Sequence, residues 1–256
     1  YRGIHYAKNE AQPEGGPMKR IAVIFAGGVG ARMNNSKTPK QFLEWNGRPI
    51  LIQTLDVFEQ TDLIDGIVLA YKAEWIEHTQ NLIKEAGLQK VLSIVPGGES
   101  ALDSQYNGLA EAKRLFPNED VTVLIHDGVR PLIDEDIITA NIETVKKFGN
   151  AITCSPTKES VVLIEEDNSI QMVVERDKSR TAKAPESFYL KDILSASEKS
   201  ISKGIVNEID SCTLMSHYGV KMHIVEGNYD NIKITTPEDF YMFRAIYDAR
   251  ENDQLL

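Results

Sequence analysis

The chain has 256 residues, of which 42% are hydrophobic and 26% are charged, values typical of soluble globular proteins. Its formal net charge of −10 argues against non-specific binding to nucleic acid, which requires a net basic face. No apolar run approaches the roughly 20 residues of a membrane span, and the two cysteines, Cys154 and Cys212, are too few for a disulfide framework and form no C-x-x-C pair. We therefore expect a soluble protein of a reducing, cytoplasmic compartment, without a zinc site.

The first 17 residues differ from the rest of the chain. They are polar, contain Pro13 and the run Gly15-Gly16-Pro17, and show no apolar period. We expect residues 1–17 to be a flexible leader or an expression remnant, since they lack the apolar stretch of a signal peptide. Residues 18–256 are expected to form a single domain.

A glycine turn follows the first predicted strand. Residues 21–25, IAVIF, form an unbroken apolar run that is typical of a strand buried on both faces. Three glycines come next, Gly27, Gly28 and Gly30, and two cations follow at Arg32 and Lys40. Backbone N–H groups of a glycine turn together with cations can hold phosphate. The alternative is a plain β-to-α turn, which the glycines alone leave open and which the two cations make less attractive.

Two common nucleotide motifs do not fit this turn. A P-loop requires a lysine followed by Ser or Thr at fixed spacing, and none is present there. The dinucleotide fingerprint G-x-G-x-x-G requires a third glycine at the position of Met33.

Strands and helices alternate over most of the remaining chain. The periodicity predicts helices over 50–61, 75–86, 100–116 and 134–148, and strands over 66–71, 90–95, 121–125 and 151–155. Further helices are predicted over 190–203, 210–218 and 237–250, and a further strand over 221–225. This alternation predicts an α/β fold with a doubly wound, mostly parallel twisted sheet. Ligands of such sheets bind beyond the carboxyl ends of the strands, where the loops at Gly27, Gly97 and Asp127 are expected to gather.

Two short β-prone runs, 161–165 and 170–175, interrupt the alternation and predict a hairpin around Glu166-Asp167-Asn168. We expect it to protrude as an arm, about residues 156–180. The alternative is that it only lengthens an edge of the sheet.

The first loop, A-G-G-x-G-x-R-M followed by P-K-Q, resembles the signature of the CTP-dependent sugar-alcohol phosphate cytidylyltransferases. This family includes the 2-C-methyl-D-erythritol 4-phosphate and D-ribitol-5-phosphate enzymes. Three further stretches are similar to the family in the same order: Gly97-Gly98 with Ser104, the H-D-x-x-R-P segment 126–131, and N-I-K-I-T at 231–235. The resemblance covers about residues 20–245 and implies a Rossmann-like nucleotidyltransferase fold.

The resemblance also implies roles for individual residues. Three cations would stabilise the reacting α-phosphorus: Arg32, Lys40 and Lys233. The nucleotide would contact Ala26, Gly27, Gly28, Gly30, Gly98, Ser104 and Asp127, and Asp127 would also hold Mg²⁺. The acceptor would contact Arg130, Ser160 and Arg176, and the arm would pair two subunits in a homodimer.

Several residues of these motifs also have a purely structural interpretation. Asp127 and Arg130 could form a pair that fixes a turn, and Glu99 or Ser100 could cap the helix after the second glycine turn. Lys233, in a β-like run between Ile232 and Ile234, could be a solvated surface lysine.

The function implied is transfer of CMP from CTP to a small polyol phosphate. Where the family usually shows T-P-Q-x-F, this chain has Ala184-Pro185-Glu186-Ser187-Phe188, and where it often shows T-D, this chain has Ile209-Asp210. These departures, the A-G-G-x-G opening and the valine at 129 favour D-ribitol 5-phosphate over 2-C-methyl-D-erythritol 4-phosphate. A nucleotidyltransferase using another nucleotide or a sugar 1-phosphate, and a catalytically idle dimeric nucleotide-binding module, remain alternatives.

Overall fold

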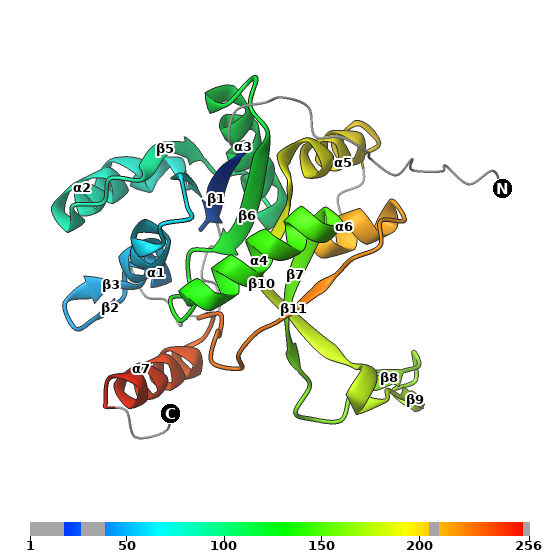
Figure 1. Ribbon diagram of the computed structural model, residues 1–256. Helices are drawn as coiled ribbons and strands as arrows, with labels where there is room; N and C mark the ends of the chain where they lie inside the picture. The colour runs from blue at the N-terminus through cyan, green and yellow to red at the C-terminus, as the bar shows by residue number, and fades with distance from the viewer. Residues whose placement is uncertain (1–17, 27–38, 205–209, 253–256) are drawn as a thin grey trace.

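The computed structural model describes residues 18–26, 39–204 and 210–252 (Figure 1). Its main sheet has seven strands in the order β11-β7-β10-β6-β1-β4-β5. Their bounds are β1 Lys19–Phe25, β4 Gly66–Tyr71, β5 Val91–Pro96, β6 Val121–Asp127, β7 Asn150–Pro156, β10 Arg180–Tyr189 and β11 Ile224–Glu226. All neighbouring strands are parallel except β10, which runs antiparallel between β6 and β7. The predicted doubly wound, mostly parallel sheet is confirmed.

Helices cover both faces of this sheet. They are α1 Ile50–Gln60, α2 Ile76–Ala86, α3 Ala101–Leu115, α4 Glu135–Phe148, α5 Leu190–Ser202, α6 Ser211–His217 and α7 Pro237–Glu251. Alternate residues of β1 point to opposite faces: Ala22 and Ile24 pack with α1 and α4, whereas Ile21 and Val23 pack with α3 and α5. Because β1 is buried on both faces, its sequence reads as a continuous apolar run. None of the described helices is long and apolar enough to cross a membrane.

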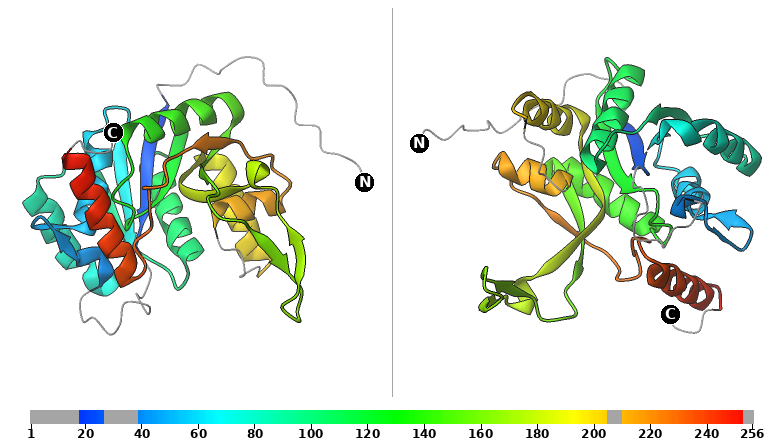
Figure 2. Two further views of the ribbon diagram at one scale, coloured as in Figure 1. Left: turned by 90° about the horizontal axis from the view of Figure 1, so that it is seen from below. Right: turned by 180° about the vertical axis from the view of Figure 1, so that it is seen from behind.

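The hairpin arm stands apart from the main sheet. It consists of β8, Val162–Ile164, and β9, Ile170–Val173, which pair only with each other and turn at Asn168. The 3-10 helix η3, Arg176–Lys178, leads from the arm into β10. Figure 2 shows the arm extending away from the body of the molecule. The alternative that it lengthens an edge of the main sheet is therefore wrong.

Some elements were not predicted. The antiparallel strand β10 was missed, and so was a small hairpin of β2, Glu44–Trp45, and β3, Arg48–Pro49. That hairpin turns on Asn46-Gly47, both with positive φ, as a two-residue Asn-Gly turn requires. The expected β-like run around Lys233 is wrong, because residues 227–236 form no strand. They lie against the turn after β6, where the backbone N–H of Ile234 donates to the oxygen of Val129 at 3.0 Å.

Candidate functional site

The carboxyl ends of four parallel strands meet at one edge of the sheet. The backbone N–H of Ala26, after β1, donates to the oxygen of Ala70 in β4 at 3.0 Å. Gly97, after β5, donates to Tyr71 at 2.6 Å, and Gly128, after β6, donates to Phe25 at 2.9 Å. The predicted gathering of the second and third loops is confirmed. Gly27, Gly28, Gly30 and Arg32 lie outside the described residues.

Asp127, the last residue of β6, forms the centre of the site. The residue is 6% exposed, and its carboxylate forms ion pairs with two cations: Arg130 Nε lies 2.7 Å from Oδ2, and Lys233 Nζ lies 2.6 Å from Oδ1. Burial alone raises the pKa of Asp127, but Arg130 and Lys233 outweigh burial and bring it to about 2. The carboxylate is therefore ionised at neutral pH.

Arg130 is held by its own turn and by the segment that carries Lys233. Arg130 Nη1 donates to the oxygen of Asn231 at 2.9 Å. The imidazole Nε2 of His126 lies 3.1 Å from the oxygen of Arg130. Burial lowers the pKa of His126 to about 4, so the ring is neutral and serves packing and hydrogen bonding. The structural Asp–Arg pair considered above exists, and it presents both side chains to the same site as Lys233.

Lys233 is not a free surface lysine. Its side chain is 42% exposed along its length, while its ammonium group is paired with the buried Asp127. The backbone on its C-terminal side is fixed by a capping box between Thr236 and Asp239 at the start of α7. The ammonium group of Lys233 is therefore held next to the buried carboxylate by a backbone segment of defined structure.

The second glycine turn is tightly packed. Gly98 N–H donates to Ser104 Oγ at 3.0 Å, and Ser104 Oγ donates to the oxygen of Ser100 at 3.0 Å. A Cβ atom on Gly98 would lie 2.1 Å from Cβ of Asp103. Ser100 and Asp103 form a capping box at the start of α3, so Ser100 is the helix cap. Because Ser104 is fully buried, its observed role is to shape the loop.

Lys40 lies in η1, Lys40–Phe42, which is held against the end of β1. The neighbouring Gln41 donates from Nε2 to the oxygen of Ala26 at 3.1 Å. Lys40 is 8% exposed. The predicted lysine therefore lies beside the end of the first strand.

Ser160 and Arg176 lie together at the base of the arm, where Arg176 Nη2 is 3.5 Å from Ser160 Oγ. Both side chains are exposed. Neither lines the pocket beside Asp127 described next.

A pocket of about 130 Å³ opens beside Asp127. Its lining combines three cations, two further acids and an amide with apolar walls: Arg130, Lys183, Lys233, Glu186, Asp210, Gln105, Phe25, Ala101, Ile125, Asp127, Ala182 and Ala184. Strands β1, β6 and β10, the starts of α3 and α6, and the two loops that carry Arg130 and Lys233 thus meet at one cavity. A cavity with both cations and hydroxyl-binding groups fits a small phosphorylated polyol.

Sequence reasoning missed Lys183. Its Nζ donates to the backbone oxygens of Tyr229 at 2.9 Å and Asn231 at 3.2 Å. Burial lowers the pKa of Lys183, and the nearby Arg130 lowers it further. A signal was present, since Lys183 and Glu186 are ionisable residues in a stretch of otherwise small or apolar ones, but that stretch was not recognised as a strand.

Glu186 was noted only as a departure from the family pattern. It is 7% exposed, and its Oε2 accepts a hydrogen bond from Cys212 N–H at 3.1 Å. Burial, and then the charge of Asp210, raise the pKa of Glu186 to about 8. The side chain is therefore mainly a neutral carboxylic acid at pH 7.

The carboxylate of Asp127 is the metal ligand predicted from sequence. The described residues contain no group of three His, Cys, Asp or Glu side chains that could hold a metal ion by themselves. One carboxylate is enough for Mg²⁺ when nucleotide phosphates supply further oxygens. The site thus fits a metal that arrives with a triphosphate.

The chain is similar in sequence to proteins named as cytidylyltransferases. The chain is 52% identical over 238 residues to a protein named ribitol-5-phosphate cytidylyltransferase from Streptococcus agalactiae serotype V, covering 93% of this chain and 99% of that one. It is 36% identical to a 2-C-methyl-D-erythritol 4-phosphate cytidylyltransferase from Desulforamulus reducens, with coverage of 90% and 96%.

Among solved structures, the chain resembles 4-diphosphocytidyl-2C-methyl-D-erythritol synthase from Anaerococcus prevotii. The TM-score is 0.78 at 28% identity, covering 90% of this chain and 96% of that one. Residues 20–249 match the family described as IspD, 2-C-methyl-D-erythritol 4-phosphate cytidylyltransferase, and the chain belongs to this family of CTP-dependent nucleotidyltransferases.

Proposed function

We propose that this enzyme transfers CMP from CTP to D-ribitol 5-phosphate. The observation that carries the proposal is the convergence of Arg130 and Lys233 on the buried Asp127, beside a pocket of small-molecule size. A phosphate oxygen of the acceptor attacks the α-phosphorus of CTP, and the bond from that phosphorus to the bridging oxygen breaks. CDP-ribitol and pyrophosphate are the products.

The chain supplies charge and position for this reaction. Nucleotidyl transfer depends mainly on in-line placement and on cations at the developing negative charge. Lys233 can exchange Asp127 for an α-phosphate oxygen, while Arg130 orients the acceptor. Lys40 approaches from the first loop, where Arg32 is expected to join it.

Asp127 would hold Mg²⁺ once Lys233 has turned toward phosphate. The metal would neutralise charge on the triphosphate and favour departure of pyrophosphate. Activity is expected to disappear with EDTA and to return when excess Mg²⁺ is added. Full activity in EDTA would refute this part of the proposal.

The acceptor assignment is supported by sequence similarity. Relatives from Streptococcus agalactiae and Vibrio parahaemolyticus, 52% and 47% identical, are named ribitol-5-phosphate cytidylyltransferases. Relatives named 2-C-methyl-D-erythritol 4-phosphate cytidylyltransferase, from Desulforamulus reducens and Clostridium novyi, are 36% and 34% identical. 2-C-methyl-D-erythritol 4-phosphate is therefore the second candidate.

Pyrophosphate release tests the function directly. We expect turnover with CTP and D-ribitol 5-phosphate, and weak or no turnover when ATP, GTP or UTP replaces CTP. The variant Lys40→Ala should keep the thermal stability of the wild type and lose turnover. Turnover only with methylerythritol phosphate would overturn the acceptor, and no turnover with either polyol would overturn the function.

We also propose that the arm pairs two copies of the chain. Seven large apolar side chains of the arm are 40–63% exposed: Val161, Val162, Leu163, Ile164, Ile170, Met172 and Val173. An apolar patch of this kind is unfavourable on a monomer and typical of an interface. In a homodimer, the arm could bring Arg176 to the neighbouring subunit's site.

Sedimentation tests this interface. Leu163→Asp combined with Met172→Asp should convert a dimer into a monomer, because two charges would be buried in the interface. Matched substitutions on the exposed surface of α7, Tyr241→Asp and Met242→Asp, serve as the control. A dimer that survives the arm substitutions would exclude this mode of pairing.

The location proposed for the enzyme is the cytoplasm. Both cysteines, Cys154 and Cys212, are free thiols, which supports a reducing compartment. Cell fractionation with activity measurement checks this location, and activity found outside the cytoplasmic fraction would contradict it.

A further inference from the structure

The pocket beside Asp127 is lined at two depths. In the pairing of β10 with β6, Glu186 lies opposite Ile125, two residues before Asp127 along β6. Two residues of strand correspond to about 6.6 Å, so Glu186 lies deeper in the sheet than the Asp127 cluster. The cations at Asp127 therefore lie nearer the carboxyl end of β6 than Glu186 does.

Gln105 contributes an unused donor to the deep part. This side chain of α3 is 4% exposed and lines the pocket. Its Oε1 accepts a hydrogen bond from Ser211 Oγ at 2.7 Å, which fixes the amide. Its Nε2 donates no hydrogen bond within the described part of the chain. This Nε2 is not one of the described side-chain atoms that are both fully buried and unpaired, so it is open to the pocket, where a ligand oxygen can accept a hydrogen bond from it.

Glu186 adds a second donor to the same lining, since Gln105 accepts from Ser211 and Glu186 accepts from the adjacent Cys212. Its neutral form carries an O–H group, and Cys212 N–H already satisfies Oε2. Asp210 lies beside it at the start of α6, where its Oδ1 accepts a hydrogen bond from Thr213 N–H at 2.7 Å. Together the wall offers two donors and a carboxylate acceptor, which is the set that neighbouring hydroxyl groups need.

We propose that Gln105, Glu186 and Asp210 form a subsite that binds the hydroxyl groups of the acceptor farthest from its phosphate. The inference rests on the proposed function and adds to it the residues that select the acceptor. A hydroxyl pairs with Gln105 Nε2 and with the Glu186 acid, whereas a methyl or hydrogen at that place makes no hydrogen bond with either donor. Sites of this kind discriminate strongly against analogues that lack the hydroxyl.

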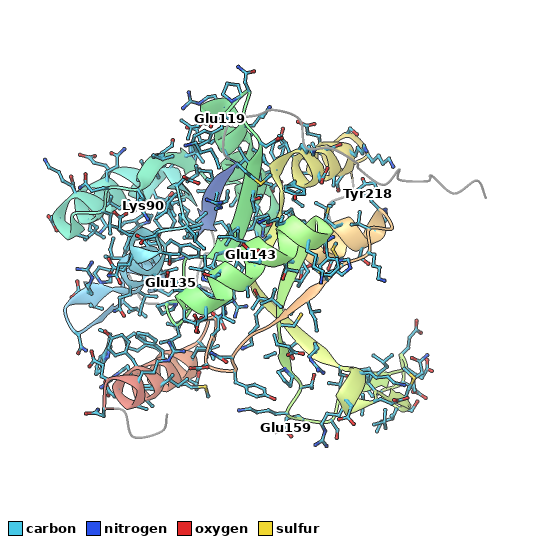
Figure 3. The ribbon with its side chains drawn as sticks, viewed as in Figure 1. Lys90, Glu119, Glu135, Glu143, Glu159 and Tyr218 are labelled. Carbon is cyan, nitrogen blue, oxygen red and sulfur yellow. The ribbon has the colours of Figure 1, made fainter. Side chains whose placement is uncertain are left out.

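Two pairs of variants test the subsite. Glu186→Met and Gln105→Met remove the donors and keep the side-chain length, whereas Glu186→Gln keeps a neutral donor. Glu143→Gln on α4 is the matched control, because Glu143 is exposed on the outer side of that helix (Figure 3). Thermal unfolding checks that each variant is folded.

The readout separates the two depths of the pocket. The KM for D-ribitol 5-phosphate is measured for each protein, together with the KM for CTP and the inhibition constant of glycerol 3-phosphate, which is too short to reach the deep groups. We expect both Met variants to raise the KM for ribitol phosphate about tenfold, which corresponds to a loss of about 1.4 kcal/mol of binding free energy. The other two constants should change less than twofold, Glu143→Gln should resemble the wild type, and Glu186→Gln should raise the KM for ribitol phosphate less than Glu186→Met does.

A pH profile adds an independent test. Glu186 faces the charges of Asp210 and Asp127 and the backbone N–H groups of Cys212 and Ser211. The wild type should lose affinity for ribitol phosphate as the pH rises through about 8, the pKa of Glu186, and Glu186→Gln should not.

Each result decides between explanations. Unchanged KM for ribitol phosphate in both Met variants would overturn the subsite while leaving the cytidylyltransferase function intact. An equal rise in all three constants would show that the residues only support the fold, and would also overturn the subsite. A wild type that does not turn over ribitol phosphate would overturn the proposed function, and the subsite with it.

Discussion

The substitution Glu186→Gln should stabilise the fold at alkaline pH. In the unfolded chain the ordinary pKa of a glutamate is 4.5, and in the folded protein the pKa of Glu186 is about 8. Between these values the folded protein holds a proton that the unfolded chain has released. The contribution of Glu186 to stability is therefore fully present below pH 4.5 and is lost as the pH rises to about 8.

The magnitude follows from the same linkage. Well inside this window each pH unit changes the unfolding free energy by about 1.4 kcal/mol, and the slope halves at the folded pKa, so moving from pH 6 to pH 8 should cost the wild type about 2 kcal/mol through this one group. The amide of Glu186→Gln does not titrate, and it can still accept the hydrogen bond from Cys212. The variant should therefore gain about 2 kcal/mol over the wild type between these two pH values.

Urea denaturation at pH 6, 7 and 8 measures this difference. The wild type, Glu186→Gln and the exposed control Glu143→Gln are compared under identical ionic strength, and the control should follow the wild type. If the free-energy difference between Glu186→Gln and the wild type stays constant within about 0.5 kcal/mol, the carboxyl group is not held neutral and the reasoning fails.

Three further substitutions test other parts of the site. Lys183→Met should raise the KM for the polyol phosphate about tenfold and leave the KM for CTP unchanged. The exposed Lys84→Met is the control. An effect on the KM for CTP alone would contradict a contact between Lys183 and the polyol phosphate. Gly98→Ala places a Cβ atom 2.1 Å from Asp103 Cβ, so it should destabilise the protein by about 1–3 kcal/mol and weaken CTP binding, and wild-type values would contradict the packing. Asp127→Asn should lower kcat at least ~100-fold, and retention of kcat would exclude Asp127 from the reaction.

The parallel part of the fold could be predicted because its signals are local. The strand of residues 21–25 is buried on both faces and reads as one apolar run, and α4 begins and ends at clear signals, Asp134 and Gly149. Strand β10 could not be predicted in the same way. Its sequence, RTAKAPESFY, mixes charges with a proline, and it is buried at its centre only because β6 and β7 enclose it.

The candidate site was predictable where its residues follow strand ends or motifs. Asp127 and Arg130 come directly after a buried run, and Lys233 stands in a segment that resembles the family. Gln105 could not be found, because its approach to the pocket depends on the rotation of α3, and Lys183 can be placed there only once β10 is recognised as a strand and its register is known. Neither the rotation of α3 nor the register of β10 can be predicted from the local sequence.

A competition experiment tests the central claim most directly. The enzyme is given CTP, Mg²⁺ and equal concentrations of D-ribitol 5-phosphate and 2-C-methyl-D-erythritol 4-phosphate, and the CDP products are separated and identified by mass spectrometry. The product ratio equals the ratio of the two kcat/KM values. The account predicts that CDP-ribitol predominates, whereas a predominance of CDP-methylerythritol, or the absence of both products, would contradict it.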